Sequence, residues 1–492
     1  MAKALMVQGT ASNSGKSLLT AALCRIFRQA GYSAAPFKAQ NMALNSYITK
    51  EGLEIGRAQA VQAQAAGIEP DVRMNPVLLK PSSDTGSQVI VNGEVYGNYS
   101  AREFYAMKQS LRPKIKAAYD SLAAQYDIIV LEGAGSPAEI NLKQDDLVNM
   151  GMAAMAKAPV LLCGDIDRGG VFASLAGTML LLEPEERDLV KGMVINKFRG
   201  DVEILRPGLS QLEKLTGVPV LGVVPWLTVD IEEEDSLSET LSHTQAGMID
   251  IAVIRLPRIS NFTDFGALEL AQGIRVRYVN SPEQFGHPAM AILPGTKNTM
   301  ADLLWMRQNG LESVMKKYAA SGGIVFGICG GYQMLGQELR DPDQVEHGGT
   351  LAGMGLLPDC TLFIPQKTRT RKQGCFKQVQ GALSDLSGIP FEGYEIHMGI
   401  TNSNTSLTLA GQEKGGSQQG NIYGTYYHGI FDRIEVVQAL AKALYRSQGL
   451  EGADYTVDNP EAFRQKQFDL LAEGVRKSLA MEQIYRILEK GV

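Results

Sequence analysis

Near the start of this chain an apolar run, a glycine-containing loop and an amphipathic segment follow one another directly, and this order restricts the fold more than any other feature. The apolar run covers residues 4–7, and the loop GTASNSGKS covers residues 9–17. A loop between a strand and a helix presents backbone N–H groups and a helix N-terminus to phosphate. A glycine turn with only a structural role is the alternative, but the flanking strand and helix favour a nucleotide. We expect Gly15, Lys16 and Ser17 to bind ATP phosphates, with Ser17 also a ligand of Mg²⁺.

Further short apolar runs in the first half predict the other strands of this domain. They cover residues 128–131, 160–163, 193–195 and 220–224, with helical patterns between them. Strands that are apolar on both faces are typical of a parallel sheet covered by helices. We therefore predict the α/β class, with a doubly wound parallel sheet of the P-loop type. Glu132 follows the first of these runs, at a strand end where such sheets bind ligands. An exposed strand-end acid is the alternative, but beside the phosphate loop we expect a Mg²⁺ ligand.

The phosphate loop also carries a family resemblance. It has five residues between its first glycine and Gly15, one more than the common P-loop. At every position it resembles the longer loop of the dethiobiotin synthetase family, written G-T-x-[ST]-x-x-G-K-[ST]. The resemblance implies that Lys38 reaches the transferred phosphoryl group and that Asn196 lies at the adenine-contacting position. Without it, an isolated lysine such as Lys38 would be interpreted as a solvated surface residue.

A cysteine between glycines is the main feature of the second half. The segment GICGG, residues 327–331, follows the apolar run 324–326 and precedes a helical pattern. Small residues on both sides permit the sharp turn that exposes a nucleophile, and a helix N-terminus favours a thiolate. A buried structural cysteine is the alternative, but the glycines favour Cys329 as a nucleophile. We expect the backbone N–H groups of Gly330 and of Gly295, in the turn after another predicted strand, to form the oxyanion hole.

A cysteine nucleophile needs a base, and the chain has five histidines. His428 lies in the run YGTYYHG, and with the cysteine it resembles class I glutamine amidotransferases, where the activating histidine follows about a hundred residues later. His397 is the rival, and we interpret it as an orienting or structural residue. The acid that this class carries two residues after the histidine is replaced by Ile430. Either a dyad suffices, or another acid such as Glu395 or Asp432 orients the ring.

Charge and cysteine usage restrict the partners and the compartment. The chain has 47 Lys and Arg against 53 Asp and Glu, a net charge of −6. Because this balance is nearly even, no overall field favours nucleic acid or an anionic membrane, and we expect neither as a partner. The five cysteines are odd in number and form no C-x-x-C pair, which is typical of free thiols in a reducing compartment. With no signal-peptide or membrane-spanning pattern, we expect a cytoplasmic protein.

An ATP site and a glutaminase in one chain predict ATP-dependent amidation of a carboxylate. ATP would convert the carboxylate to an acyl phosphate, and ammonia released from glutamine at Cys329 would displace phosphate. Ammonia released to water at neutral pH is protonated, whereas delivery within the protein keeps it neutral and locally concentrated. Two sites in one chain therefore fit one reaction.

The domain organisation follows from the same motifs. The predicted parts are an ATP-dependent amide synthetase domain at 1–229, an acidic and polar linker at 230–247, a class I glutamine amidotransferase α/β domain at 248–440 and a C-terminal helical extension at 441–492. Apolar residues from Val437 to Leu479 recur at helical spacing and predict helices that pack on the second domain. The polar stretch 402–420 has no such pattern and predicts an exposed loop.

Along its whole length the chain resembles the cobyric acid synthase family of cobalamin biosynthesis. Besides the phosphate loop and the cysteine segment, the matching motifs in family order are PFKAQNMALNS (36–46), SQV (87–89), GDIDRGGVFA (164–173), LPGTKNT (293–299) and YYHGIF (426–431). The resemblance implies a corrinoid substrate, adenosylcobyrinic acid a,c-diamide, amidated on its b, d, e and g carboxylates with glutamine and ATP.

Three alternatives stay open at this point. The sister enzyme, cobyrinic acid a,c-diamide synthase, shares both domains. Another glutamine-dependent carboxylate amide ligase, such as one acting on a cell-wall precursor, would also use both sites. A P-loop partitioning or regulatory ATPase would explain the first domain but would leave Cys329 and His428 without a function. The sequence does not indicate the oligomeric state.

Overall fold

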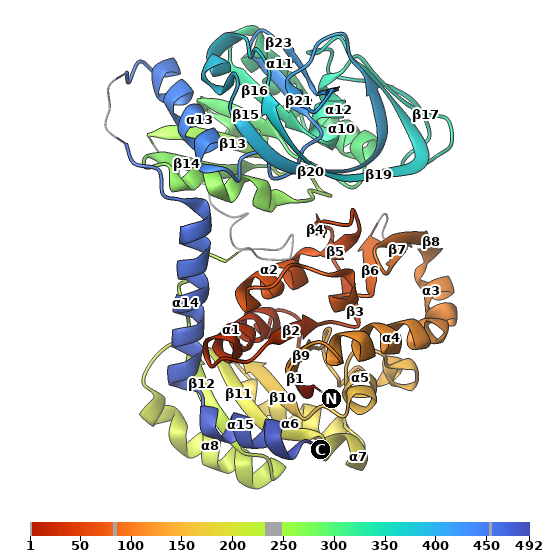
Figure 1. Cartoon of the computed structure of the whole chain (residues 1–492), viewed down its shortest axis with the longest axis vertical. Coiled ribbons are helices and arrows are strands. Elements are labelled where there is room, and N and C mark those ends of the chain that lie inside the picture. Colours follow the sequence, from red (N-terminus) through yellow and green to blue (C-terminus); the bar gives the residue numbers. More distant parts are fainter. Residues whose placement is uncertain (1, 82–85, 232–247, 452–454) are drawn as a thin grey trace. The chain divides into compact units, whose positions relative to one another are not determined.

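The computed structural model describes residues 2–81, 86–231, 248–451 and 455–492 (Figure 1). Most of the predicted linker, residues 232–247, lies outside the described residues. The chain divides into two compact units. Unit 1 contains residues 1–43, 54–232 and 464–492, and unit 2 contains residues 44–53 and 233–463. The sequence does not predict that residues 44–53 belong to unit 2.

The main sheet of unit 1 is fully parallel, with the strand order β12-β11-β10-β1-β9-β2. Its strands are β1 (Lys3–Gly9), β2 (Ala34–Phe37), β9 (Ile128–Glu132), β10 (Val160–Asp165), β11 (Val190–Phe198) and β12 (Val220–Pro225). Most of their residues are buried because helices cover the sheet, which is why the strands are apolar without alternation. The predicted doubly wound sheet is confirmed. Since all six strands run the same way, the residues that follow β1, β2, β9 and β11 lie at one edge.

Helices and a small second sheet complete unit 1. The helices are α1 (Lys16–Gln29), α2 (Arg57–Ala66), α3 (Ala101–Met107), α4 (Arg112–Ala123), α5 (Met150–Ala156), α6 (Val171–Leu181), α7 (Pro184–Arg187), α8 (Val202–Thr216), α14 (Pro460–Ser478) and α15 (Met481–Lys490), with 3₁₀ turns η1 (Val72–Met74), η2 (Lys108–Leu111) and η3 (Ile140–Asp145). The small sheet contains β3 (Gln40–Met42), β6 (Val77–Pro81), β7 (Gly86–Val91) and β8 (Glu94–Ser100), and β5 (Glu54–Gly56) leads into α2.

The C-terminal helices α14 and α15 pack in unit 1, so the prediction that they cover the second domain is wrong. Phe468 and Leu471 of α14 are buried in the same cluster as Leu5 and Val7 of β1. An ion pair of 2.8 Å joins Arg25 of α1 to Asp469. The periodic apolar stripe of α14 correctly indicates a buried face, but periodicity does not specify the surface that buries it.

Unit 2 is built on a second, mostly parallel sheet with the order β14-β13-β15-β16-β24-β23. Its strands are β13 (Ile249–Ile254), β14 (Ile274–Val279), β15 (Met290–Leu293), β16 (Ile324–Ile328), β23 (Ser417–Gln419) and β24 (Ile422–Thr425), and only the edge strand β23 is antiparallel. Its helices are α9 (Pro282–Phe285), α10 (Thr299–Gln308), α11 (Leu311–Ala320), α12 (Gly330–Leu335) and α13 (Ile434–Ser447), with 3₁₀ turns η5 (Phe262–Leu270) and η6 (Gly381–Leu386). The predicted second α/β domain is therefore present, and α13 packs on it as expected.

A further sheet of unit 2 contains β17 (Glu338–Asp341), β18 (Gly349–Ala352), the long pair β19 (Cys360–Phe376) and β20 (Pro390–Asn402), β21 (Thr408–Ala410) and β22 (Glu413–Gly415); β4 (Ser46–Ile48) also lies in this unit. The prediction of an exposed loop at 402–420 is wrong, since β21, β22 and β23 fall in this stretch. Thr408 and Ser417 are fully buried. The backbone of this stretch pairs with β19 and β24, a pairing that needs no apolar pattern.

Candidate active sites

The phosphate loop lies between β1 and α1, as predicted. Gly15 precedes α1 with φ of 90°, a left-handed conformation that glycine adopts without strain. A Cβ at Gly15 would lie 2.1 Å from the side-chain amide nitrogen of Asn196, so a larger residue would have to displace that amide. Lys16 Nζ donates to the carbonyl oxygens of Ala11 at 2.8 Å and of Gly135 at 3.1 Å. The lysine ammonium is thus held at the loop, and its role toward phosphate stays a prediction.

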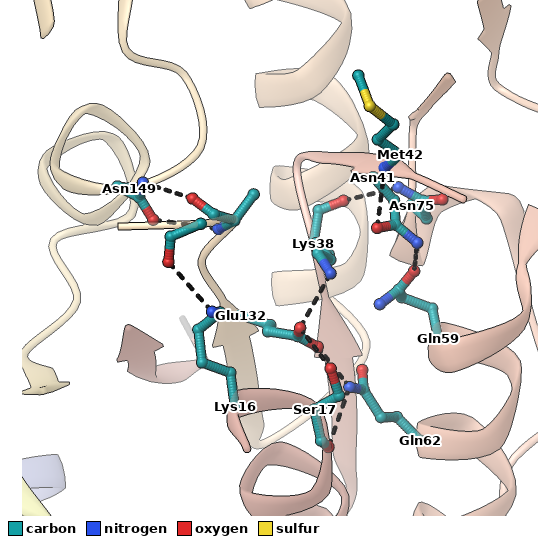
Figure 2. Close-up of polar contacts among 12 residues, drawn as sticks. Lys16, Ser17, Lys38, Asn41, Met42, Gln59, Gln62, Asn75, Glu132 and Asn149 are labelled. Atoms are coloured by element: carbon teal, nitrogen blue, oxygen red, sulfur yellow. Dashed lines mark hydrogen bonds and ion pairs between the residues drawn. The ribbon is translucent and has the colours of Figure 1, made fainter. Parts of the chain in front are cut away.

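Glu132, Ser17 and Lys38 meet at the carboxyl ends of β9 and β2 (Figure 2). Glu132 is 1% exposed and accepts hydrogen bonds from Ser17 Oγ at 2.8 Å, Lys38 Nζ at 2.9 Å and Gln62 Nε2 at 2.6 Å. Burial alone would raise the pKa of Glu132, but the Lys38 ammonium and the three hydrogen bonds lower it below its usual value. Glu132 is therefore a buried carboxylate anion, and the structure brings together the residues that the sequence predicts for phosphate and metal.

The oxygen donors of this cluster fit Mg²⁺. Mg²⁺ prefers oxygen ligands and is usually held by one or two carboxylates together with substrate phosphates. The Ser17 hydroxyl and the ionised Glu132 supply such oxygens 2.8 Å apart. No group of three or more His, Cys, Asp or Glu able to hold a metal occurs in the described ranges, so a metal here would depend on nucleotide oxygens for its other ligands.

Asn196 and its neighbour contact the same loop from β11. The Asn196 Nδ2 atom donates to the carbonyl oxygen of Ser14 at 3.0 Å. Lys197, with φ of 60°, donates to the carbonyl oxygen of Asn13 at 2.7 Å and pairs with Asp165 at 3.1 Å. Asn196 is thus hydrogen-bonded to the phosphate loop, and its role toward adenine stays a prediction.

Cys329 occupies the sharp turn between β16 and α12. Its φ of 52° and ψ of −110° are strained for a residue with a side chain, as is typical of a nucleophile elbow. A Cβ at Gly331 would lie 2.0 Å from the carbonyl oxygen of Leu293, and one at Gly327 would lie 2.8 Å from the backbone of Tyr332. A side chain at either position would collide with this backbone, so both positions require glycine. This agrees with the sequence argument that small residues beside Cys329 permit the sharp turn of a nucleophile.

His428 is held by Asp264, a residue that the sequence does not single out. The Nδ1 atom of His428 lies 2.7 Å from Asp264 Oδ2, while the backbone N–H of Gly429 donates to Asp264 Oδ1 at 3.0 Å. The hypotheses that Glu395 or Asp432 orients the ring are wrong, because Asp264 occupies that place. Asp264 lies in the 3₁₀ turn η5, 164 positions before the histidine, and no local pattern marks it.

The electrostatics of this pair favour a charged imidazole. Burial alone would lower the pKa of His428, but the Asp264 carboxylate and the interaction with Cys329 raise it to about 10. His428 is 1% exposed and Asp264 3% exposed, so water screens their attraction little. The arrangement suits a cysteine thiolate paired with an imidazolium.

His397 lies on β20 and has other partners. Its Nδ1 atom lies 2.7 Å from the carbonyl oxygen of Gly399, and its ring stacks on Tyr426 with centroids 3.7 Å apart. The Cys329 thiol is 3.7 Å from the carbonyl oxygen of Ile396, the preceding residue. The Nε2 atom of His397 lies 3.9 Å from Glu395 Oε1, a longer contact than the 2.7 Å between His428 and Asp264, so His428 is the better-oriented base.

Of the two glycines predicted for the oxyanion hole, one lies next to the nucleophile and the other next to its base. Gly330 follows Cys329 at the start of α12, and a Cβ on it would lie 2.8 Å from Thr296 Cγ2. A Cβ on Gly295 would lie 2.7 Å from His428 Cε1. Gly330 thus adjoins Cys329 in the chain, Gly295 borders His428, and the role of both as donors stays a prediction.

Comparisons with known proteins agree with a nucleotide-binding domain and a glutamine amidotransferase domain in this chain. A model described as a CobQ/CobB/MinD/ParA nucleotide binding domain matches residues 5–238, and a CobB/CobQ-like glutamine amidotransferase domain matches residues 250–436. A protein from Ruminiclostridium cellulolyticum named cobyric acid synthase is 59% identical over 100% of this chain and 98% of its own length. The chain belongs to the cobyric acid synthase family. A second member, from Lachnoclostridium phytofermentans, is 52% identical with 100% of both chains covered, and one from Clostridium acetobutylicum is 50% identical with 98% of each covered.

Membership confirms the family resemblance and the α/β fold class of both domains. The protein is a glutamine-dependent amidotransferase of the ligase class, with a nucleotide-binding domain and a role in cobalamin amidation. No helix in the described part of the chain combines the length and the apolar character needed to cross a bilayer.

Proposed function

We propose that this enzyme converts adenosylcobyrinic acid a,c-diamide to adenosylcobyric acid by amidating its b, d, e and g carboxylates, with one ATP and one glutamine used for each amide. The observation that supports the proposal is that one chain holds two clusters of side chains, each suited to one half of the reaction. Ser17, Lys38 and the ionised Glu132 meet beside the phosphate loop, and in the other unit Asp264 is hydrogen-bonded to His428 beside Cys329. The first set fits phosphoryl transfer, and the second fits amide hydrolysis.

In the synthetase site, positive charges around the loop would stabilise phosphoryl transfer from ATP to a substrate carboxylate. Lys16 and Lys38 would neutralise charge on the transferred group. When bound, Mg²⁺ would be held by Ser17 and Glu132 and would supply further charge neutralisation at the phosphates. The carboxylate oxygen attacks the terminal phosphorus, ADP leaves, and the resulting acyl phosphate is open to attack by ammonia. Phosphate then leaves and the amide is complete.

In the glutaminase site, the Cys329 thiolate would attack the side-chain amide carbon of glutamine. The backbone N–H groups of Gly330 and Gly295 would stabilise the oxyanion that forms. The His428 imidazolium donates a proton to the departing nitrogen, so ammonia and a thioester result. Water then attacks the thioester while neutral His428 accepts its proton as general base, and the thiolate leaves, so that glutamate is released and the Cys329 thiolate and His428 imidazolium are restored. Asp264 keeps the imidazole ring oriented through both steps.

Mass spectrometry of a time course tests the substrate. Purified enzyme is incubated with ATP, Mg²⁺, glutamine and either cobyrinic acid or its a,c-diamide in the adenosylated form. Stepwise conversion of the a,c-diamide to the fully amidated b, d, e and g product, with ADP and glutamate formed in step, is expected. A product that stops at the a,c-diamide would assign the chain to the sister reaction. Absence of ATP-dependent amidation of any corrinoid would refute the proposal.

A further inference from the structure

Residues 44–53 lie in the sequence of the synthetase half but belong to unit 2, the glutaminase unit. Asn45 accepts a hydrogen bond from the backbone N–H of Asn261 at 2.6 Å. In return, the Asn261 side chain accepts from the backbone N–H of Ser46 at 3.2 Å. All three residues are buried, with exposures of 2% or less. This reciprocal pairing is a specific docking of the segment rather than a surface contact.

Asn261 is directly connected to the orienting acid. It has φ of 53° and immediately precedes η5, and its carbonyl oxygen accepts from the backbone N–H of Asp264 at 3.1 Å. The left-handed backbone of Asn261 costs energy unless its surroundings fix it. Asn45 satisfies the Asn261 N–H at this strained position. The place of the Asp264 carboxylate therefore depends on a turn that residues 44–53 hold.

The same segment also reaches the histidine side of the pair through Tyr394. The Tyr394 hydroxyl donates to the carbonyl oxygen of Ser46 at 3.2 Å. Its ring is stacked on His428 with centroids 5.4 Å apart, and the two residues exchange backbone hydrogen bonds of 3.0 and 2.8 Å. Tyr47 lies against the Tyr394 ring at 5.9 Å, and the Arg371 guanidinium lies 5.4 Å from the Tyr47 ring.

We propose that Asn45 is a positioning residue of the glutaminase, acting through Asn261 on the Asp264–His428 pair. Residues 44–53 would then be part of the glutaminase, although they lie within the synthetase half of the sequence. Asn45 is only seven positions after Lys38. The inference rests on the proposed roles of Cys329 and His428. Small misplacements of a catalytic group cost up to about 100-fold in rate. We therefore expect Asn45→Ala to lower kcat for glutamine hydrolysis roughly 10- to 100-fold, with little change in KM.

The test compares Asn45→Ala with Asn404→Ala, a matched change at an exposed asparagine of the same unit. Glutamate release and corrinoid amidation are measured with glutamine, and amidation is also measured with ammonium chloride. The ratio of glutamine-dependent to ammonia-dependent amidation should fall in Asn45→Ala and stay at the wild-type value in Asn404→Ala. Asn45→Asp, which keeps an acceptor oxygen for the Asn261 N–H, should recover part of the loss.

A second readout separates positioning from a loss of folding. The rate at which iodoacetamide alkylates Cys329 is followed against pH by peptide mass spectrometry. If Asn45 acts on the His428–Asp264 pair, the pH profile of alkylation shifts in Asn45→Ala. A wild-type ratio and profile in Asn45→Ala, or equal losses with glutamine and with ammonia, would overturn the inference. Cys329→Ala with intact glutamine-dependent amidation would instead overturn the proposed function, so the two failures are distinguishable.

Discussion

The hydrogen bond between Asp264 and His428 is tested most directly by Asp264→Asn. Asparagine has nearly the same shape, so the buried turn of η5 keeps its packing while the negative charge is lost. Its side-chain oxygen can still accept from the Gly429 N–H, as Asp264 Oδ1 does at 3.0 Å. The amide nitrogen, however, would face the histidine and favour the wrong tautomer.

The size of the effect follows from the proton affinity of the histidine. The pKa of His428 is raised from 6.5 to about 10. At 1.36 kcal/mol for each tenfold change in affinity, this is a net stabilisation of the imidazolium on the order of 5 kcal/mol, which remains after burial has opposed the contributions of Asp264 and Cys329. Loss of the Asp264 share, together with the wrong tautomer, should reduce kcat for glutamine hydrolysis by roughly 10² to 10⁴. Because the pKa of His428 falls, the alkaline limb of the pH–rate profile should move to lower pH.

The assay follows glutamate release at saturating glutamine from pH 6 to about 10.5, with ammonia-dependent amidation measured on the same preparations. Asp432→Asn is the matched control, since it removes a carboxylate close to Gly429 without touching the Asp264 hydrogen bond. Glutamine hydrolysis should fall in Asp264→Asn far more than in Asp432→Asn, while ammonia-dependent amidation persists. A wild-type rate and alkaline limb in Asp264→Asn, or equal effects of both substitutions, would refute the assigned role.

Three further predictions concern the other reactive side chains. Cys329→Ala should abolish glutamine-dependent amidation and leave amidation from ammonium salts unchanged, and His428→Ala should have the same effect. Normal glutaminase activity in His428→Ala would instead identify His397 as the base. Lys16→Ala should remove ADP formation with either nitrogen source, because phosphoryl transfer needs the positive charge of this lysine. An unchanged rate of ADP formation with corrinoid and ammonia would contradict the phosphate-loop assignment. Glu132→Gln breaks the buried ion pair with Lys38, which should cost up to about 3–5 kcal/mol of stability and prevent Mg²⁺-dependent ATP binding. Calorimetric unfolding and ATP titration measure the two effects, and an unchanged melting temperature would contradict the first.

Much of both sites could be predicted because their signals are local. The loop at residues 9–17 and the elbow at Cys329 each place a strand, a turn and a helix within a short stretch of chain. In such a stretch the glycine positions follow from backbone sterics alone. Glu132 could be expected beside the loop because the carboxyl ends of parallel strands share one edge, whereas the role of Lys38 was implied by the family resemblance alone. The structure has them paired at 2.9 Å.

The amino-acid sequence by itself thus determined the two α/β domains, the phosphate loop and the cysteine nucleophile, since each depends on hydrophobic pattern or on the backbone freedom of a few adjacent residues. The tertiary structure alone decided that Asp264 orients His428, that residues 44–53 belong to the glutaminase unit and that α14 packs in unit 1. Asp264 and His428 are 164 positions apart in the sequence, so their hydrogen bond forms only because the order of the strands in the sheet brings the segments that carry them together. An apolar stripe shows only that a face is buried, because burial against either domain removes the same apolar surface from water.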